Sequence, residues 1–227
     1  GFGAAGERCM AISVAVPVGK ETADALIERL VPKIEKLKVG PYTAGDDVDY
    51  GPVITAQAKE RIEGLIASGV EQGAKLVTDG RNLNIQGYEN GYFVGPTLFD
   101  EVTPEMDIYK EEVFGPVLSM VRKDSYEDAL GLILDNQYGN GTAIYTADGD
   151  VARDFVNKVE VGMVGVNFPI PVPLSYYSFG GWKKSAFGDL DQYGPDAFKF
   201  YTKTKKVSAR WFSGIKDGAA MNFKSID

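Results

Sequence analysis

Two hydrophobic periodicities alternate along most of the chain. Residues 21–38 place Leu26, Leu30 and Leu37 at helical spacing with charged residues between them, which predicts an amphipathic helix. Residues 10–18 are rich in small and β-branched residues, which predicts a buried strand. The same patterns predict strands at 75–78, 92–99, 117–122, 142–146 and 163–167, and helices after Thr55, at 125–134 and at 150–158. This order predicts an α/β fold with a mainly parallel sheet and helices on both faces.

The C-terminal third departs from this pattern. Residues 168–189 contain Pro169, Pro171, Pro173 and several glycines, which indicates a long loop. Beyond it, residues 198–211 alternate polar and apolar side chains, as an exposed antiparallel strand does. Residues 213–227 are small and polar, and we expect them to form a tail.

Composition narrows the function classes. The 227 residues are 44% hydrophobic and 25% charged, as in a soluble globular chain with a sizeable core. The net charge of −8 is spread along the sequence, and the basic run at 203–206 reads as a solvated strand face, so we expect no nucleic-acid partner. No apolar run is long enough to cross a bilayer, so we expect no membrane partner.

Cysteine and histidine counts restrict the chemistry further. A single cysteine cannot form an internal disulfide, which indicates a reducing compartment: the cytoplasm, or the mitochondrial matrix of a eukaryotic cell. The chain has no histidine, which excludes a cysteine–histidine or serine–histidine couple and any histidine-based zinc site within it. Catalysis would depend on a thiol, carboxylates, cations and backbone dipoles, and we expect no metal.

The first candidate segment presents that thiol. Residues 1–6 match the glycine pattern of a dinucleotide fingerprint, but a strand is predicted after them where the fingerprint needs a helix, so we interpret the match as coincidental. A lone cysteine is most often a small buried hydrophobe. Cys9, however, lies at a loop-to-strand junction and follows the small Ala4, Ala5 and Gly6, which are expected to leave space around its sulfur. It also adjoins Arg8, which favours a thiolate. These features favour a nucleophile.

Two further segments could carry chemistry. Residues 110–117 contain paired glutamates before a Phe-Gly-Pro turn, which fits either a functional loop or a solvated helix end with a hydrophobic plug. Asn167, the proline series and Ser178-Phe-Gly-Gly181 fit either the wall of a substrate pocket or an ordinary long loop. The residues alone leave both alternatives open.

Together the three segments resemble the aldehyde dehydrogenase superfamily, in their usual order and over nearly the whole chain. Gly6-Glu-Arg-Cys9 is similar to its nucleophile motif, the glutamates and Phe-Gly-Pro of 111–116 to its cofactor-side motif, and 167–188 to its pocket loop. Finer details resemble the coenzyme-A-acylating branch that oxidises malonate and methylmalonate semialdehydes. They lie at residues 6–11, 169–173, 187–190, 200–205 and 210–211.

The resemblance implies a role for each candidate residue. Cys9 would be the nucleophile that forms a thioester, and Arg8 would bind the substrate carboxylate. Phe179 would line the aldehyde site. Glu112 would accept hydrogen bonds from the nicotinamide ribose of NAD, and Phe114 would pack beside the nicotinamide. The reaction implied yields acetyl-CoA or propanoyl-CoA, with coenzyme A as acyl acceptor and loss of carbon dioxide.

The resemblance also implies a domain organisation. Residues 1–197 would form the catalytic domain, and residues 198–212 a strand in the antiparallel sheet of a homo-oligomer, a dimer or a tetramer. The nucleotide-binding domain of that superfamily lies upstream of the cysteine, so residues 1–227 alone are expected to be inactive. Two alternatives remain: a hydrolytic aldehyde dehydrogenase for an uncharged aldehyde, and a non-catalytic unit that only folds and oligomerises.

Overall fold

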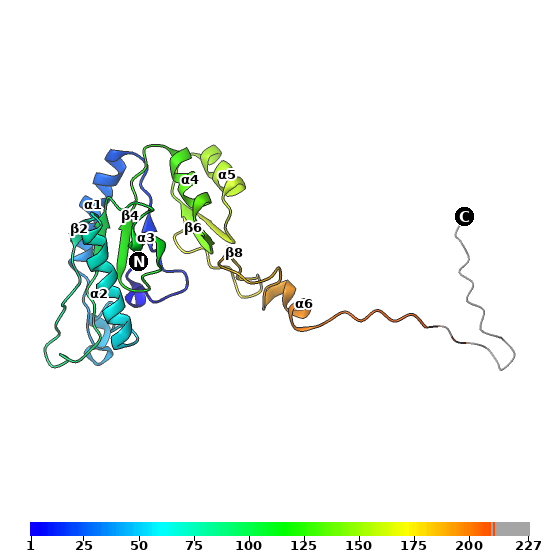
Figure 1. Cartoon of the computed structure of the whole chain (residues 1–227), viewed down its shortest axis with the longest axis horizontal. Helices are drawn as coiled ribbons and strands as arrows, with labels where there is room; N and C mark the ends of the chain where they lie inside the picture. Colours follow the sequence, from blue (N-terminus) through cyan, green and yellow to red (C-terminus); the bar gives the residue numbers. More distant parts are fainter. Residues whose placement is uncertain (210, 212–227) are drawn as a thin grey trace.

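The computed structural model describes residues 1–209 and 211; most of them form two α/β units, and residues 202–209 extend away from these units (Figure 1). The first unit holds a four-stranded sheet in the order β1-β4-β3-β2. Strand β4 pairs in parallel with β1 and β3, and β2 pairs with β3 in the antiparallel sense. The four strands are Val14–Ala15 (β1), Lys75–Thr78 (β2), Thr97–Asp100 (β3) and Val117–Met120 (β4). The predicted α/β class with a mainly parallel sheet is confirmed.

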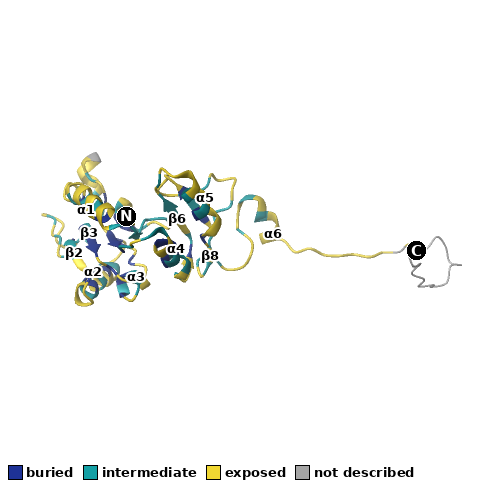
Figure 2. Cartoon of the chain, turned by 90° about the horizontal axis from the view of Figure 1, so that it is seen from above, coloured by how far each residue is buried: buried dark blue, intermediate teal, exposed yellow. Residues whose placement is uncertain are grey.

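Helices cover both faces of this sheet, because successive strand residues point to opposite sides. Leu98 packs in a cluster with residues of α1 (Lys20–Ile34), whereas its neighbour Phe99 packs in a cluster with residues of α2 (Ala56–Glu71). The two central strands are therefore buried on both sides, and Figure 2 shows the buried residues concentrated there. Thr55 caps α2 as the sequence predicts, its side chain accepting a hydrogen bond from the Ala58 N–H.

The second unit is smaller. Strands β6 (Gly141–Ile144) and β7 (Met163–Val166) form a parallel pair, packed against helices α4 (Tyr126–Asp135) and α5 (Gly149–Lys158). The remaining elements of the described chain are η1 (Gly3–Gly6), η2 (Tyr42–Asp47), α3 (Asp107–Lys110), β5 (Tyr138–Gly139), β8 (Trp182–Lys183), η3 (Gly194–Asp196) and α6 (Ala197–Tyr201). No helix in the described part of the chain is long and apolar enough to cross a membrane.

Several strands are shorter than predicted. Within residues 10–18 only Val14–Ala15 is a strand, because the chain is still turning at the start of this segment, where the Ala11 N–H donates to the Arg8 carbonyl at 3.0 Å. The rest of the segment still runs beside β4, with a bridge from Val18 to Lys123.

The predicted strand at 198–212 is wrong at its start. Residues 197–201 form α6, and residues 202–209 have no strand partner in the described chain (Figure 1). Alternation of polar and apolar residues fits the two faces of a strand, but a strand also needs a neighbouring strand for its hydrogen bonds. The described residues do not provide such a neighbour for this segment. Residues 210 and 212, and the predicted tail at 213–227, lie outside the described residues.

An arginine that pairs with a buried carboxylate ties the sheet to α1. Asp100, at the end of β3, is fully buried, and Arg122 binds its carboxylate through Nε and Nη2 at 2.8 Å each. The third guanidinium nitrogen of Arg122 donates to Asp24 of α1 at 2.8 Å. The hydrogen bonds from Arg122 hold the pKa of Asp100 below its ordinary value of 3.8. The arrangement stabilises a carboxylate that would otherwise be buried without a cation.

Removing the arginine should destabilise the fold. We expect Arg122→Met to lower the free energy of unfolding by about 3 kcal/mol near neutral pH, because it leaves the Asp100 carboxylate buried and unpaired. Since the folded-state pKa of Asp100 is lowered, the stabilisation is present above about pH 4 and is lost as the pH falls through the folded pKa. Urea denaturation of both proteins between about pH 3 and pH 7 measures this, and their stabilities should converge at the acid end. The exposed partner provides the control, since Asp24→Asn should change little. A constant difference across the range would contradict the prediction.

Candidate active site

Cys9 lies exposed in a tight turn, as the sequence predicts. The chain reaches this turn through three successive left-handed residues, Ala4, Ala5 and Gly6, with φ of 51°, 56° and 71°. Left-handed alanines are strained, so packing must hold this loop in place. Ala5 and Gly6 are in fact buried. The small residues therefore let the loop pack into the core, whereas the sequence suggested that they leave space around the sulfur.

The loop that carries Cys9 packs directly on the loop that carries Glu112 and Phe114. A Cβ atom on Gly6 would lie 2.0 Å from the Gly115 carbonyl oxygen, so the two backbones meet where no side chain fits. Gly115 in turn lies on Ile62 of α2, because its own Cβ would be 2.7 Å from the Ile62 Cδ1. The contact joins two of the three predicted functional segments.

Helix α2 also fixes the 111–116 loop through its polar side. Arg61 donates to the backbone carbonyls of Glu112 and Val113, at 3.1 and 2.5 Å. Val113 and Gly115 are buried, whereas Glu112 is exposed and Phe114 is 39% exposed with a left-handed φ of 47°. A left-handed phenylalanine costs free energy and persists only where its surroundings impose it. The loop thus leaves the carboxylates of Glu111 and Glu112 and the ring of Phe114 exposed.

Two side chains hold the cysteine turn on either side. The Glu7 carboxylate accepts a hydrogen bond from the Ile54 N–H at 3.2 Å, which ties the turn to the segment before α2. On the other side, the Asn140 Nδ2 donates to the Cys9 carbonyl at 3.0 Å. Asn140 stands between β5 and β6, so the turn bridges the two units; Figure 1 shows the dark-blue N-terminal segment extending between them. Arg8, beside Cys9, is exposed.

The third segment reaches the site through the second unit. Phe179 is half-buried, and the next residue, Gly180, packs on Gly162 so closely that a Cβ there would lie 2.1 Å from the Gly180 carbonyl oxygen. The Gly162 N–H donates to the Gly139 carbonyl at 2.9 Å, next to Asn140. Phe179 is therefore connected to the cysteine turn through this row of glycines. Asn167 is exposed and binds the backbone of Thr146 through both atoms of its amide.

Sequence reasoning missed Arg61 and Asn140. Arg61 appears as one more charged residue on the polar face of a predicted helix, and Asn140 as a turn residue between two glycines. Both residues matter because of hydrogen bonds to segments far away in the sequence, and no pattern in the neighbouring residues indicates such bonds.

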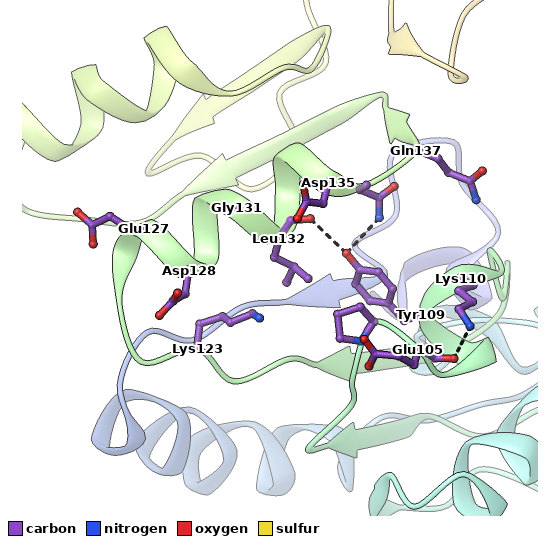
Figure 3. Close-up of a pocket in the computed structure, with 12 residues that line it drawn as sticks. Glu105, Tyr109, Lys110, Lys123, Glu127, Asp128, Gly131, Leu132, Asp135 and Gln137 are labelled. Atoms are coloured by element: carbon purple, nitrogen blue, oxygen red, sulfur yellow. Dashed lines mark hydrogen bonds between the residues drawn. The ribbon is translucent and has the colours of Figure 1, made fainter.

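A separate pocket of about 610 Å³ lies between α3 and α4 (Figure 3). Tyr109 crosses it, donating to the Leu132 carbonyl at 3.5 Å and accepting from the Asn136 amide at 3.2 Å. Its other lining residues are largely charged and of both signs: Glu105, Lys110, Lys123, Glu127, Asp128 and Asp135. None of the predicted site residues lines this pocket, so the candidate chemistry lies elsewhere.

Comparisons with known proteins identify the family of the chain. The model of the aldehyde dehydrogenase family matches residues 1–207, and the chain belongs to that family. It is 59% identical over 210 residues to a malonate-semialdehyde dehydrogenase from Pseudomonas aeruginosa, covering 92% of this chain and 42% of the relative. It is 49% identical over 212 residues to the bovine methylmalonate-semialdehyde/malonate-semialdehyde dehydrogenase [acylating], mitochondrial, covering 92% of this chain and 38% of the relative.

Solved structures give the same class. A Sinorhizobium meliloti structure assigned to methylmalonate-semialdehyde dehydrogenase and complexed with NAD is similar with a TM-score of 0.90 and 64% identity, over 96% of this chain and 44% of that one. The methylmalonate-semialdehyde dehydrogenase of Oceanimonas doudoroffii gives a TM-score of 0.88 and 55% identity, over 94% and 43%. The chain thus spans about two fifths of the length of the relatives it matches.

Proposed function

We propose that Cys9 is the nucleophile of an NAD-dependent, coenzyme-A-acylating oxidation of malonate or methylmalonate semialdehyde. One observation carries the proposal: the exposed Cys9 turn packs, through Gly6, on the loop that directs Glu112 and Phe114 outward. The names of the relatives, several of them semialdehyde dehydrogenases described as acylating, support the substrate and the acyl acceptor.

The outward groups suit the nicotinamide half of NAD. An exposed carboxylate such as Glu112 can accept hydrogen bonds from two ribose hydroxyls. The exposed ring of Phe114 can flank a flat nicotinamide. Both groups are held by a loop that Arg61 and buried neighbours keep in place, so little ordering remains to be done on binding.

The reaction begins when the Cys9 Sγ attacks the aldehyde carbon; a C–S bond forms and the electron pair of the carbonyl moves to its oxygen. Bound NAD supplies the hydride acceptor that lets this thiohemiacetal become a thioester. The carboxylate of the substrate, first held by Arg8, leaves as carbon dioxide; the electron pair of the broken C–C bond passes to the thioester carbonyl as an enolate, and the α-carbon then takes a proton from water. Coenzyme A, as its thiolate, then attacks the thioester carbon and displaces the Cys9 sulfur, giving acetyl-CoA or propanoyl-CoA and the Cys9 thiolate.

Because residues 1–227 alone are expected to be inactive, turnover measurements on a polypeptide that joins them to a nucleotide-binding domain test the proposal. With NAD and malonate semialdehyde we expect NADH to form, with acetyl-CoA produced in step when coenzyme A is present. Acid product formed at an undiminished rate without coenzyme A would instead indicate the hydrolytic alternative. Absence of turnover with every aldehyde, together with an unreactive Cys9, would contradict the assignment.

Arg8 should determine selectivity for an acidic aldehyde. We expect Arg8→Ala to lower kcat/KM for malonate semialdehyde roughly 30- to 1000-fold and to affect a neutral aldehyde far less, because it removes a charge-assisted partner of the substrate carboxylate. The control is Arg29→Ala, which removes another exposed arginine, from α1. Equal losses on both aldehydes would mean that Arg8 acts on the thiol and not on the substrate.

We also propose that residues 202–211 join a sheet of a homo-oligomer. Val207 and Trp211 are 77% and 93% exposed, and pairing of this segment with a strand of a partner would cover them. The mitochondrial location in the name of the bovine relative supports a matrix location if the source is eukaryotic, and the bacterial relatives support the cytoplasm otherwise.

A further inference from the structure

Asn140 makes a contact that neither the sequence motifs nor the proposed reaction accounts for. Its Nδ2 donates to the main-chain carbonyl of Cys9 at 3.0 Å and lies 3.2 Å from the Met10 sulfur. The two residues are 131 positions apart in sequence and belong to different units. Through this hydrogen bond, a side chain of the second unit holds the backbone of the candidate nucleophile.

The backbone that carries the Asn140 side chain is itself held by hydrogen bonds. The Asn140 carbonyl accepts from the Met163 N–H at 3.2 Å, and the preceding residue, Gly139, donates through its N–H to the Ser185 hydroxyl at 3.0 Å. Met10 packs over Gly141, where a Cβ would lie 2.6 Å from the Met10 methyl carbon. The Asn140 amide therefore comes from ordered backbone, and its direction is set before it meets Cys9.

This hydrogen bond determines how the peptide unit between Cys9 and Met10 is oriented. The C=O and N–H of a trans peptide point in opposite directions, so holding the Cys9 carbonyl toward Asn140 also fixes the Met10 N–H and the ψ angle of Cys9. The carbonyl carries the negative end of that dipole. The hydrogen bond from Asn140 partly neutralises that negative end, which would otherwise oppose a thiolate and the negative charge that develops on the aldehyde oxygen.

We infer that Asn140 is a positioning residue for the Cys9 nucleophile, acting through the main-chain carbonyl of Cys9; this inference rests on the proposed function. The competing interpretation is that the hydrogen bond only fastens the two units together. The two differ in what a variant should change: reactivity of the thiol in the first, global stability alone in the second.

Alkylation by iodoacetamide distinguishes the positioning role of Asn140 from a purely structural one, because Cys9 is the single cysteine of the chain and its reactivity can be followed directly. For Asn140→Leu we expect the alkylation rate of the folded protein to fall roughly three- to tenfold, the range that loss of one hydrogen bond gives. In turnover assays kcat should fall by a similar factor while the KM for NAD stays unchanged. The matched control is Asn136→Leu, which removes a half-buried asparagine amide bonded to the Tyr109 hydroxyl and should leave alkylation unchanged.

Asn140→Asp provides a second variant of the same size. It replaces the donor with a carboxylate that repels the Cys9 carbonyl, so we expect a larger loss of alkylation rate than in Asn140→Leu. If the leucine variant does not fold, the alkylation rate of Asn140→Asp alone tests whether Asn140 affects the reactivity of the thiol. Alkylation within twofold of the wild-type rate in both folded variants would overturn the inference, as would labelling of both that merely follows global unfolding. A wild-type Cys9 that is itself unreactive would instead overturn the proposed nucleophile and this inference with it.

Discussion

Replacing Cys9 with alanine should abolish turnover while leaving the fold intact. We expect kcat/KM to fall roughly 10⁴-fold or more, because the covalent route is lost and the chain contains no histidine or second thiol to replace it. The melting temperature should change little, since the Cys9 side chain is exposed. NADH absorbance and thermal denaturation measure the two effects.

The serine variant serves as the control for shape. Cys9→Ser preserves the geometry of the turn but offers a much weaker nucleophile, so it should be nearly as inactive as the alanine variant. Activity above about a tenth of the wild-type value in Cys9→Ala would mean that another group carries the chemistry, and the assignment would have to be abandoned.

Gly6→Ala should give the second large effect, on stability and on the site together. The added Cβ would lie 2.0 Å from the Gly115 carbonyl oxygen, at a backbone φ of 71° that alanine adopts only with strain. The Gly115 backbone cannot shift away from the added Cβ, because it packs on Ile62, which is fully buried. We expect a loss of about 3 kcal/mol in the free energy of unfolding, combining overpacking and left-handed strain. Urea denaturation followed by circular dichroism measures it.

Gly3 offers a matched control within the same loop. Nothing lies within 4 Å of a Cβ placed there, and its φ is not left-handed, so Gly3→Ala should change stability by less than about 0.5 kcal/mol. Alkylation of Cys9 should also change in Gly6→Ala and not in Gly3→Ala. Similar stabilities for the two variants would show that the Gly6 contact with Gly115 does not constrain the loop.

Periodicity predicted the elements of the described chain well because their burial is regular. The central strands are buried on both faces and the helices show apolar stripes, so the order of elements and the two-faced sheet could be read in advance. The rejection of the dinucleotide fingerprint also agrees with the structure, since residues 1–6 lead into a turn and then β1 and not into a helix. The order of the elements and the rejection of the fingerprint could both be predicted because each depends on residues that are close together in the sequence.

What the sequence could not supply is the packing between distant segments. Gly6 and Gly115 are recognisable as motif glycines, yet nothing local indicates that they touch. Asn140 and Arg61 likewise act on backbone atoms far away in sequence, and any asparagine or arginine could do so. The roles of Arg8, Glu112, Phe114 and Phe179 remain predictions carried by the family resemblance.

Helix α2 links the site to the rest of the protein. Its successive residues Arg61 and Ile62 support the 111–116 loop, one from the polar side and one from the apolar side, and through Gly6 that loop supports the cysteine turn. Catalytic loops are commonly among the first segments to open as a protein is warmed. Here the loops cannot open without disturbing a fully buried residue of the main core. Heat inactivation should therefore coincide with global melting instead of preceding it, and substitutions in the core of α2 should not be neutral for catalysis.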